Sequence, residues 1–307
     1  MDKKKIPLNA YLTVICILLA ALYSFSFFVK PTVDKRKSVK TALLNPKYKN
    51  EISQIQIHDS SSQLFLQKNK DVWEIVDFEN PFVKLPADSK RINKMIDDFS
   101  QIIGAVQVSV KVDKSDSLTS QNFGFDDSAV EIDFFAGGES AGEIVFGKND
   151  FTQTRRYIKT HSSNLAYEIE DFASIYLTTS IQSWSESGLI SQQVLGNIKA
   201  DDIQRIIADG RTFTNSDSLY KEYVSKLLEL RHRGINLNEQ FNTENSVYKI
   251  KLELGNKNNI DIFVYKTSRE GNYLVQLNYL NFKTNELSVY YESISEWTFS
   301  RLKYQKN

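Results

Sequence analysis

Residues 130–150, VEIDFFAGGESAGEIVFGKND, decide the fold of this chain. Apolar and polar side chains alternate on either side of a glycine pair, through Ile132 and Phe134 and again through Ile144 and Phe146. An alternation of period two predicts half-buried strands. The segment GGESAG between them lacks the GK[ST] ending of a phosphate-binding loop and favours a tight turn. The stretch therefore predicts an antiparallel hairpin with one face on a core.

A similar pattern recurs 118 residues later, in YKIKLELGNKNNIDIFVYKTS over residues 248–268. The two stretches superpose without a gap, so that Ile132 corresponds to Ile250. Gly137 likewise corresponds to Gly255. Few residues are identical, and strand periodicity alone produces such matches by chance. A diverged internal duplication is the other explanation, and the matching order of elements in the two halves favours it.

Both halves of the chain show the same order of predicted elements, which is strand, amphipathic helix and then a meander of strands. Asp88 is the expected N-cap of the first helix, whose apolar residues recur every three or four positions from Ile92 to Ile103. The second helix is expected near residues 219–230. The strands are expected at residues 52–57, 64–66, 72–76, 130–135, 143–146, 156–159, 166–169, 203–207, 248–254, 261–265, 273–277 and 287–291.

The predicted fold class is therefore α+β, with two related modules of antiparallel sheet, each with a covering helix, behind an N-terminal single transmembrane helix. The first module is expected over residues 51–184 and the second over residues 185–307.

An apolar run without a charged residue extends from Tyr11 to Val29. At 1.5 Å per residue it would make a rod of about 28 Å, close to the thickness of the hydrocarbon core of a bilayer. A retained signal anchor is favoured over a cleaved signal peptide, because the run is longer than a secretory h-region and ends in aromatic residues. Lipid attachment at Cys16 is disfavoured, because Ile15 stands where a small residue is required.

We expect residues 1–30 to form a cytoplasmic tail and transmembrane anchor, with Tyr11 and Val29 as the membrane-anchor ends, and residues 31–50 to form a stalk. Basic residues lie on both sides of the run, so the positive-inside rule does not fix its orientation. Long domains translocate largely regardless of charge. The body is therefore expected outside the cytoplasm, held by a single pass in the cell inner (cytoplasmic) membrane.

The charge balance and the cysteine count bear on nucleic-acid binding, on disulfide bonds and on zinc sites. The chain has 38 basic and 38 acidic side chains, and this zero net charge argues against a nucleic-acid partner. Its one cysteine, Cys16, lies within the apolar run. The body can therefore form no intramolecular disulfide and no cysteine-based zinc site.

The sequence contains no motif that predicts a catalytic, cofactor-binding or metal site. His58, His161 and His232 have no acidic or histidine partner at metal-ligand spacing. Adjacent acids occur at Asp97-Asp98, Asp126-Asp127 and Asp201-Asp202. Sequence neighbours point apart on helices and strands, so these pairs are interpreted as caps and turns. No serine lies in a G-x-S-x-G elbow. We therefore expect no enzyme and no cofactor.

Several motifs resemble the bacterial domain-of-unknown-function family numbered 4340. They are the basic N-terminus with one spanning helix, Ile52-x-x-Ile55-x-Ile57, Val72-Trp73-Glu74-Ile75, Pro86-Ala87-Asp88, Asn122-Phe123-Gly124-Phe125-Asp126, Ile144-Val145-Phe146-Gly147-Lys148 and Tyr157-Ile158. The resemblance extends over nearly the whole chain. It implies an envelope protein that accompanies ABC transporters of the gliding-motility type, and it supplies no catalytic residues.

The resemblance leads us to expect a non-enzymatic accessory or interaction subunit of an envelope complex. Its expected partners are the membrane lipid bilayer and an ABC permease and ATPase. The alternative is an extracytoplasmic binding module for a cell-envelope polymer or lipid, which predicts a groove with Arg155, Arg156, Tyr157 or Trp184. A third class, an envelope hydrolase, predicts a cleft in which Asp126 or Asp202 is desolvated.

Overall fold

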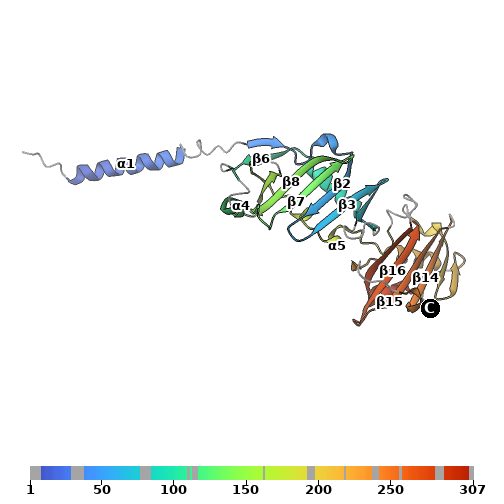
Figure 1. Ribbon diagram of the computed structural model, residues 1–307. Helices are drawn as coiled ribbons and strands as arrows, with labels where there is room; N and C mark the ends of the chain where they lie inside the picture. Colours follow the sequence, from blue (N-terminus) through green and yellow to red (C-terminus); the bar gives the residue numbers. More distant parts are fainter. Residues whose placement is uncertain are drawn as a thin grey trace, which may run out of the picture.

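The fold consists of two antiparallel sheets with covering helices and an N-terminal helix, α1 (Leu8–Phe28), that lies apart from both sheets (Figure 1). The computed structural model describes residues 8–28, 38–76, 84–108, 111–112, 117–161, 163–191, 198–217, 219–236, 242–255, 258–280 and 287–303. The predicted α+β class with two antiparallel sheets is confirmed.

Among the described residues, the first sheet has ten strands in the order β1-β6-β10-β9-β8-β7-β2-β3-β4-β5. They are β1 (Ser38–Thr41), β2 (Ile52–His58), β3 (Gln63–Asn69), β4 (Val72–Val76), β5 (Lys84–Pro86), β6 (Ile103–Gln107), β7 (Val130–Ala136), β8 (Glu139–Asn149), β9 (Arg155–Thr160) and β10 (Tyr167–Glu170). The helical elements of this half are η1 (Pro46–Tyr48), α3 (Ser89–Phe99), α4 (Ser117–Phe123), η2 (Ser174–Tyr176) and α5 (Ile181–Trp184).

In the part of the chain that the structure describes, the second sheet has seven strands in the order β12-β11-β14-β15-β16-β17-β13. They are β11 (Ile203–Ala208), β12 (Arg211–Thr214), β13 (Gly234–Asn236), β14 (Tyr248–Leu254), β15 (Asn259–Lys266), β16 (Asn272–Leu280) and β17 (Leu287–Ser295). The helical elements are η3 (Ala200–Asp202), α6 (Tyr220–Leu228), η4 (Thr243–Asn245) and α7 (Glu296–Leu302).

The two sheets repeat one topology. In the first sheet, seven neighbouring strands run β3-β2-β7-β8-β9-β10-β6, and the whole second sheet runs β12-β11-β14-β15-β16-β17-β13. Each series begins with a hairpin, continues into a four-stranded meander, and ends with the short strand that follows the covering helix. A chance match of two meanders would not also reproduce the places of the hairpin and of the strand after the helix. The internal duplication is therefore the better explanation.

The strand register supports the same conclusion. A shift of 118 positions carries three cross-strand pairs between β7 and β8 onto three pairs between β14 and β15. The pairs are Val130↔Phe146, Ile132↔Ile144 and Phe134↔Gly142 in the first sheet, and Tyr248↔Val264, Ile250↔Ile262 and Leu252↔Ile260 in the second. Because a slip of one residue would turn every side chain to the other face, an identical register preserves the same core face in both copies.

The covering helices bury equivalent faces. The buried residues of α3 are Ile92, Met95, Ile96 and Phe99, and those of α6 are Tyr220, Tyr223, Val224 and Leu227, each 128 positions later. This spacing of three and four residues lays one stripe of each helix on its sheet. Asp88 caps α3 as expected, because its carboxylate accepts hydrogen bonds from the backbone N–H groups of Lys90 and Arg91.

Two expectations about element boundaries are wrong. The predicted helix continued to Ile103, whereas α3 ends at Phe99 and Ile103 begins β6. The predicted stalk extended to residue 50, whereas β1 pairs with β6 and Leu44 is fully buried in the core of the first sheet. The segment SVKT of β1 is too short and too polar to be recognised as a strand without its partner.

No helix in the described part of the chain is both long enough and apolar enough to cross a membrane. Side chains of α1 are described for residues 13–24 only. Of the expected membrane-anchor ends, Tyr11 is described by its backbone alone, and Val29 lies outside the described residues.

Candidate functional site

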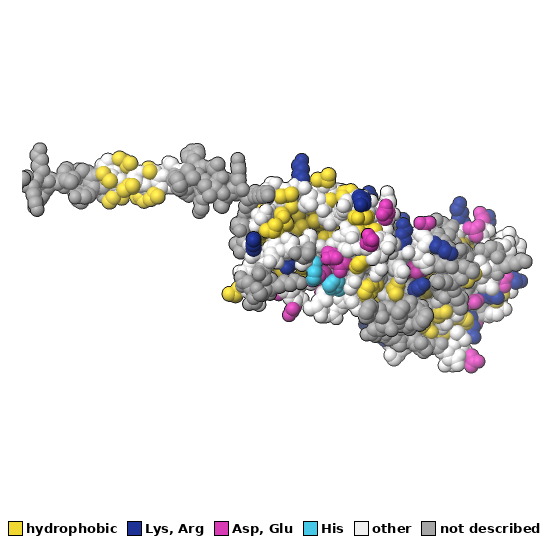
Figure 2. All heavy atoms as spheres, turned by 45° about the horizontal axis from the view of Figure 1, so that its top comes forward, with side chains coloured by type: hydrophobic (Ala, Val, Ile, Leu, Met, Phe, Trp, Pro, Cys, Tyr) yellow, Lys and Arg dark blue, Asp and Glu magenta, His cyan; other side chains and the backbone are white. Residues whose placement is uncertain are grey.

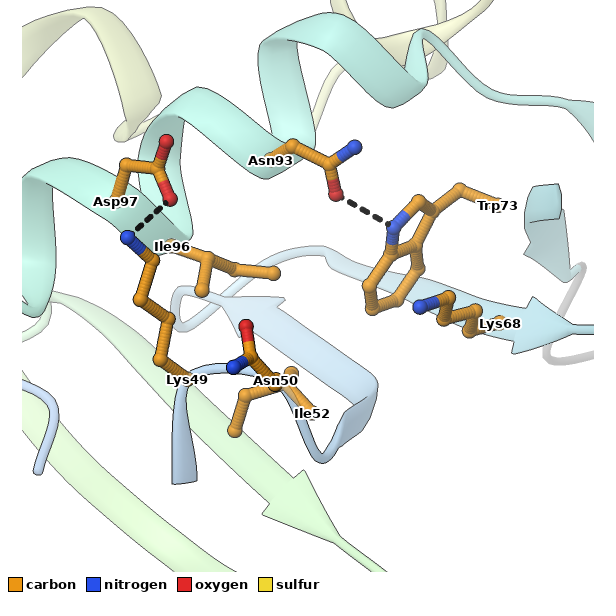
Figure 3. Close-up of a pocket in the computed structure, with 8 residues that line it drawn as sticks. All are labelled: Lys49, Asn50, Ile52, Lys68, Trp73, Asn93, Ile96 and Asp97. Atoms are coloured by element: carbon orange, nitrogen blue, oxygen red, sulfur yellow. Dashed lines mark hydrogen bonds and ion pairs between the residues drawn. The ribbon is translucent and has the colours of Figure 1, made fainter. Parts of the chain in front are cut away.

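A polar cavity of about 170 Å³ lies between α3, the β3–β4 hairpin and the turn after η1 (Figure 3). Trp73, Ile52 and Ile96 form its apolar floor, and each of these side chains is almost completely buried. Polar groups surround the floor, and they come from Lys49, Asn50, Lys68, Asn93 and Asp97. Five polar side chains above an apolar base are the arrangement of a small binding site.

Local structure explains how these residues meet. Asn93, Ile96 and Asp97 have i, i+3 and i+4 spacing and therefore share one face of α3. Lys68 and Trp73 are direct cross-strand partners in the hairpin of β3 and β4. The covering helix and the hairpin thus bring their polar residues to one opening.

The cavity carries an excess of positive charge. Nζ of Lys49 lies 2.9 Å from the Oδ1 atom of Asp97, and the indole N–H of Trp73 donates to Oδ1 of Asn93 at 3.2 Å. Lys68 makes no ion pair with another described residue. With Lys49 neutralised by Asp97, Lys68 supplies one net positive charge beside two side-chain amides. The arrangement fits a small anionic or polyhydroxylated group.

A second cluster lies on the open face of the first sheet, where Figure 2 shows histidine beside acidic side chains. His58 on β2 is the cross-strand partner of Glu131 on β7. Nε2 of His58 lies 3.3 Å from Oδ2 of Asp133, and Nδ1 of His161 lies 3.1 Å from Oε2 of Glu131. The sequence showed no acidic partner for these histidines at metal-ligand spacing, and the structure supplies acidic partners from a different strand. The pairs form because the strand register places these residues side by side. The residues are so far apart in the sequence that no local sequence pattern predicts the pairs.

Burial raises the pKa of Asp133, and the nearby His58 opposes that rise. Within the described residues, no group of histidine, cysteine and acidic side chains has the geometry to hold a metal ion.

A third cluster is buried beside the second sheet. Glu292 on β17 is 2% exposed, and its Oε1 atom lies 3.8 Å from Nε2 of His232. The imidazole Nε2–H donates to the backbone oxygen of Glu186 at 2.7 Å, and the Ser191 hydroxyl donates to the Glu186 carboxylate at 2.5 Å. No sequence motif predicted this cluster. One sequence pattern could have revealed the cluster. Glu292 lies between Tyr290 and Ile294 on the core-facing side of its strand, where an acidic residue is unusual.

The groove that the sequence analysis assigned to Arg155, Arg156, Tyr157 and Trp184 does not form. The guanidinium of Arg156 donates to Asp171 and to the backbone oxygen of Gly147. Trp184 is fully buried, and its indole N–H donates to the backbone oxygen of Thr178. The Tyr157 ring packs edge-on against Phe123. The contacts of Arg156, Tyr157 and Trp184 hold the fold together and leave no basic and aromatic groove.

The acids proposed for a hydrolase are exposed turn residues. Asp126 accepts hydrogen bonds from the hydroxyl and the backbone N–H of Ser128, which hold the pKa of its carboxyl below the ordinary value. Asp202 accepts from the backbone N–H of Lys199 and caps η3. Neither carboxyl is desolvated, whereas the hydrolase hypothesis requires a desolvated acid in a cleft.

Two of the motifs that carry the family resemblance contact each other. Gly124 has a positive φ of 70°, and an added Cβ there would collide with the backbone of Lys148. A Cβ on Gly147 would collide with the backbone oxygen of Phe123. The segments Asn122-Phe123-Gly124 and Phe146-Gly147-Lys148 thus approach so closely that both require glycine. The motifs have a structural role here.

Comparison with known proteins places the chain in a family. No curated protein and no solved structure matches the chain. The family model described as "Domain of unknown function (DUF4340)" matches residues 80–236, from just before β5 to the end of β13. The match is narrower than expected, because the motifs at Ile52 and Trp73 precede it. It covers slightly more than half of the 307 residues, so the chain belongs to the DUF4340 family.

Proposed function

We propose that this protein is a membrane-anchored, non-enzymatic accessory or interaction subunit of an envelope complex. The observation that carries the proposal is the surface of α1. Seven large apolar side chains of this helix are each more than half exposed, namely Val14, Ile15, Ile17, Leu18, Leu19, Leu22 and Tyr23. An apolar surface of this kind on a helix apart from the body requires a nonaqueous or protein partner.

The bilayer is the partner that best fits this helix. The portion with described side chains, residues 13–24, would cover only about 18 Å at the rise of an α-helix. The proposed span therefore includes the uncharged sequence on both sides, out to Tyr11 and Val29. A single pass in the inner (cytoplasmic) membrane, with the body on the extracytoplasmic side, follows from the expected orientation of a short tail before a long domain.

The two sheets suit an interaction role. In the described structure β1 and β5 are the edge strands of the first sheet, and β12 and β13 are those of the second. Edge strands present backbone groups to which another chain can add a strand. Association with an ABC permease and ATPase is supported by the family resemblance alone.

The test is in-cell crosslinking of the tagged full-length chain, followed by gentle solubilisation and mass spectrometry. We expect the chain in the membrane fraction, resistant to alkaline carbonate, with an ABC permease and ATPase crosslinked to it. The double variant Leu18→Lys/Leu22→Lys should move to the soluble fraction, because each central lysine costs about 3 kcal/mol of insertion free energy. The matched control is Leu118→Lys on α4, which leaves α1 unchanged.

Two outcomes would contradict the proposal. If alkaline carbonate extracts the wild-type chain from the membrane, the proposal that α1 is a membrane anchor is wrong. If the anchored chain is recovered without any transporter subunit, the proposed accessory role is wrong.

The cavity beside Trp73 favours a second candidate function, the binding of an anionic envelope polymer. Lys68 would contact the polymer, and such a contact weakens as salt rises. We expect Lys68→Ala to reduce retention of the chain on purified anionic polymer from its own envelope, whereas the exposed control Lys90→Ala should not. Equal retention of both variants would exclude the cavity as the binding site.

A further inference from the structure

An apolar groove of about 250 Å³ lies beside the edge strand β1. Val39, Leu43, Ile144 and Ile158 supply its aliphatic surface, and Tyr167 on β10 closes one side. The lining also includes the hydroxyl-bearing side chains of Thr41, Thr160 and Ser163, and one charged residue, Lys159. The groove differs from the cavity beside Trp73, because apolar groups dominate its lining.

The second copy of the fold lacks the conditions for such a groove. There β16 and β17 pair over nine residues, whereas β9 and β10 pair over four. The longer hairpin carries Tyr279 and Tyr290, whose rings meet edge-on at 5.6 Å and are each 2% exposed. These two tyrosines fill the core at that end of the second sheet. The fold itself therefore does not require an open groove, and the shorter hairpin of the first sheet creates it.

The charge of the lining restricts the ligand. Lys159 is the one charged residue among the lining residues, and its ammonium lies 5.2 Å from the centre of the Phe125 ring. Phe125 belongs to the small core on the other face of the sheet. The ammonium is thus directed away from the groove, and an uncharged aliphatic ligand with a polar end fits the remaining surface.

The position of the groove identifies a source for that ligand. β1 begins ten residues after α1 ends, and ten residues of chain reach at most about 36 Å. In Figure 1, β6, which pairs with β1, lies at the end of the body nearer to α1. If α1 lies in the bilayer, the groove is held within reach of lipid. We propose that this groove binds one acyl chain of a membrane lipid, an inference that rests on the anchoring function proposed above.

The experiment uses the full-length chain in vesicles of phosphatidylethanolamine and phosphatidylglycerol. A trace of the phospholipid carries a diazirine near the end of one acyl chain. After illumination, mass spectrometry locates the lipid adducts. We expect adducts on α1 and, separately, within residues 39–43 and 158–167.

Thr160→Trp narrows the opening from an exposed position. It should reduce the groove adducts about tenfold, the effect of losing the burial of roughly two methylene groups, and leave the α1 adducts unchanged. Ala42→Leu fills the groove from its other side and serves as the second variant if the first does not fold. The matched control is Lys40→Trp, because Lys40 is exposed on β1 between the two lining residues Val39 and Thr41.

The outcomes separate the two proposals. Adducts on α1 without adducts in the groove, or groove adducts that persist in both filling variants, would overturn the acyl-chain site while leaving the anchor intact. If neither region carries adducts, the proposal that α1 is a membrane anchor is wrong as well.

Discussion

The Nε2 atom of His232 lies 3.8 Å from the Oε1 atom of Glu292, and both side chains are buried. Burial lowers the pKa of His232 and raises the pKa of Glu292 well above its ordinary value of 4.5, and the nearby Glu186 raises it further. Both residues therefore favour their neutral forms in the folded protein. The pair is a contact between two neutral groups, which avoids the cost of burying an ion.

Glu292 should make the protein less stable as the pH rises. Its folded pKa is above its unfolded pKa, so the folded state binds more protons, and the stabilisation is complete only below about pH 4.5. Glu292→Gln should remove this dependence and raise the free energy of unfolding at pH 8 by at least about 1 kcal/mol. Urea unfolding from pH 5 to 9 measures the effect. An unchanged pH dependence in the variant would show that Glu292 is ionised in the folded state.

His232 should make the protein less stable as the pH falls, which is the opposite of the effect of Glu292. Its folded pKa is below the ordinary value of 6.5, so the unfolded chain binds more protons and stability is lost as the pH falls below that value. His232→Gln keeps a side-chain N–H near the backbone oxygen of Glu186 and should flatten the profile between pH 5 and 6.5. The same urea experiment measures it, with exposed His161→Gln as the control. Equal flattening by both variants would contradict the assignment.

Gly147 should tolerate no side chain, because a Cβ would collide with the backbone oxygen of Phe123. We expect Gly147→Ala to lower the free energy of unfolding by more than about 2 kcal/mol, the scale of overpacking in a tight contact. The control is Gly104→Ala on β6, where no atom lies within 4 Å of the added Cβ. Thermal unfolding compares the two. A mild effect at both positions would mean that the two family motifs do not pack as described.

The Arg156–Asp171 pair should stabilise the first sheet. Arg156 Nε lies 3.2 Å from Asp171 Oδ1, and the two side chains are only 15% and 5% exposed. Asp171→Asn would leave the guanidinium without its charge partner and should cost about 3 kcal/mol. Lys226→Gln, which breaks the exposed pair with Glu222, should cost less than about 0.5 kcal/mol. Chemical denaturation of both variants supplies the comparison, and similar losses would contradict the ranking.

Local patterns were sufficient to predict the meanders and the covering helices. The alternation in residues 248–254 coincides with β14, and the spacing from Ile92 to Phe99 identifies the buried face of α3. Periodicity works there because these elements bury one face along their whole length. It failed for β1, which is stabilised by its partner β6 and contains little apolar sequence. The 118-residue repeat was also detectable, although only the strand order and the register distinguish duplication from chance.

The candidate sites were hardly predictable, because tertiary contacts create each of them. Lys49 and Asp97 approach each other only when α3 packs on the sheet. His58 reaches Glu131 through strand pairing across more than seventy residues. Conversely, Arg156 and Trp184 looked like binding residues in the sequence, yet both are used in packing. A functional residue type in a sequence has no fixed role until its partners are known.

The cores of the two sheets should unfold together, because their buried residues form one continuous cluster. The backbone N–H of Asp88 donates to the oxygen of Trp184, and that of Leu189 donates to the oxygen of Leu230, so consecutive segments join the halves. Phe99→Ala in the first half and Leu227→Ala at the equivalent position in the second should each cost about 3 kcal/mol. Each should shift the same single transition, measured by hydrogen exchange of peptides from both sheets in increasing urea. If each variant shifts only the peptides of its own sheet, the halves are independent folding units and the shared core contributes no cooperativity.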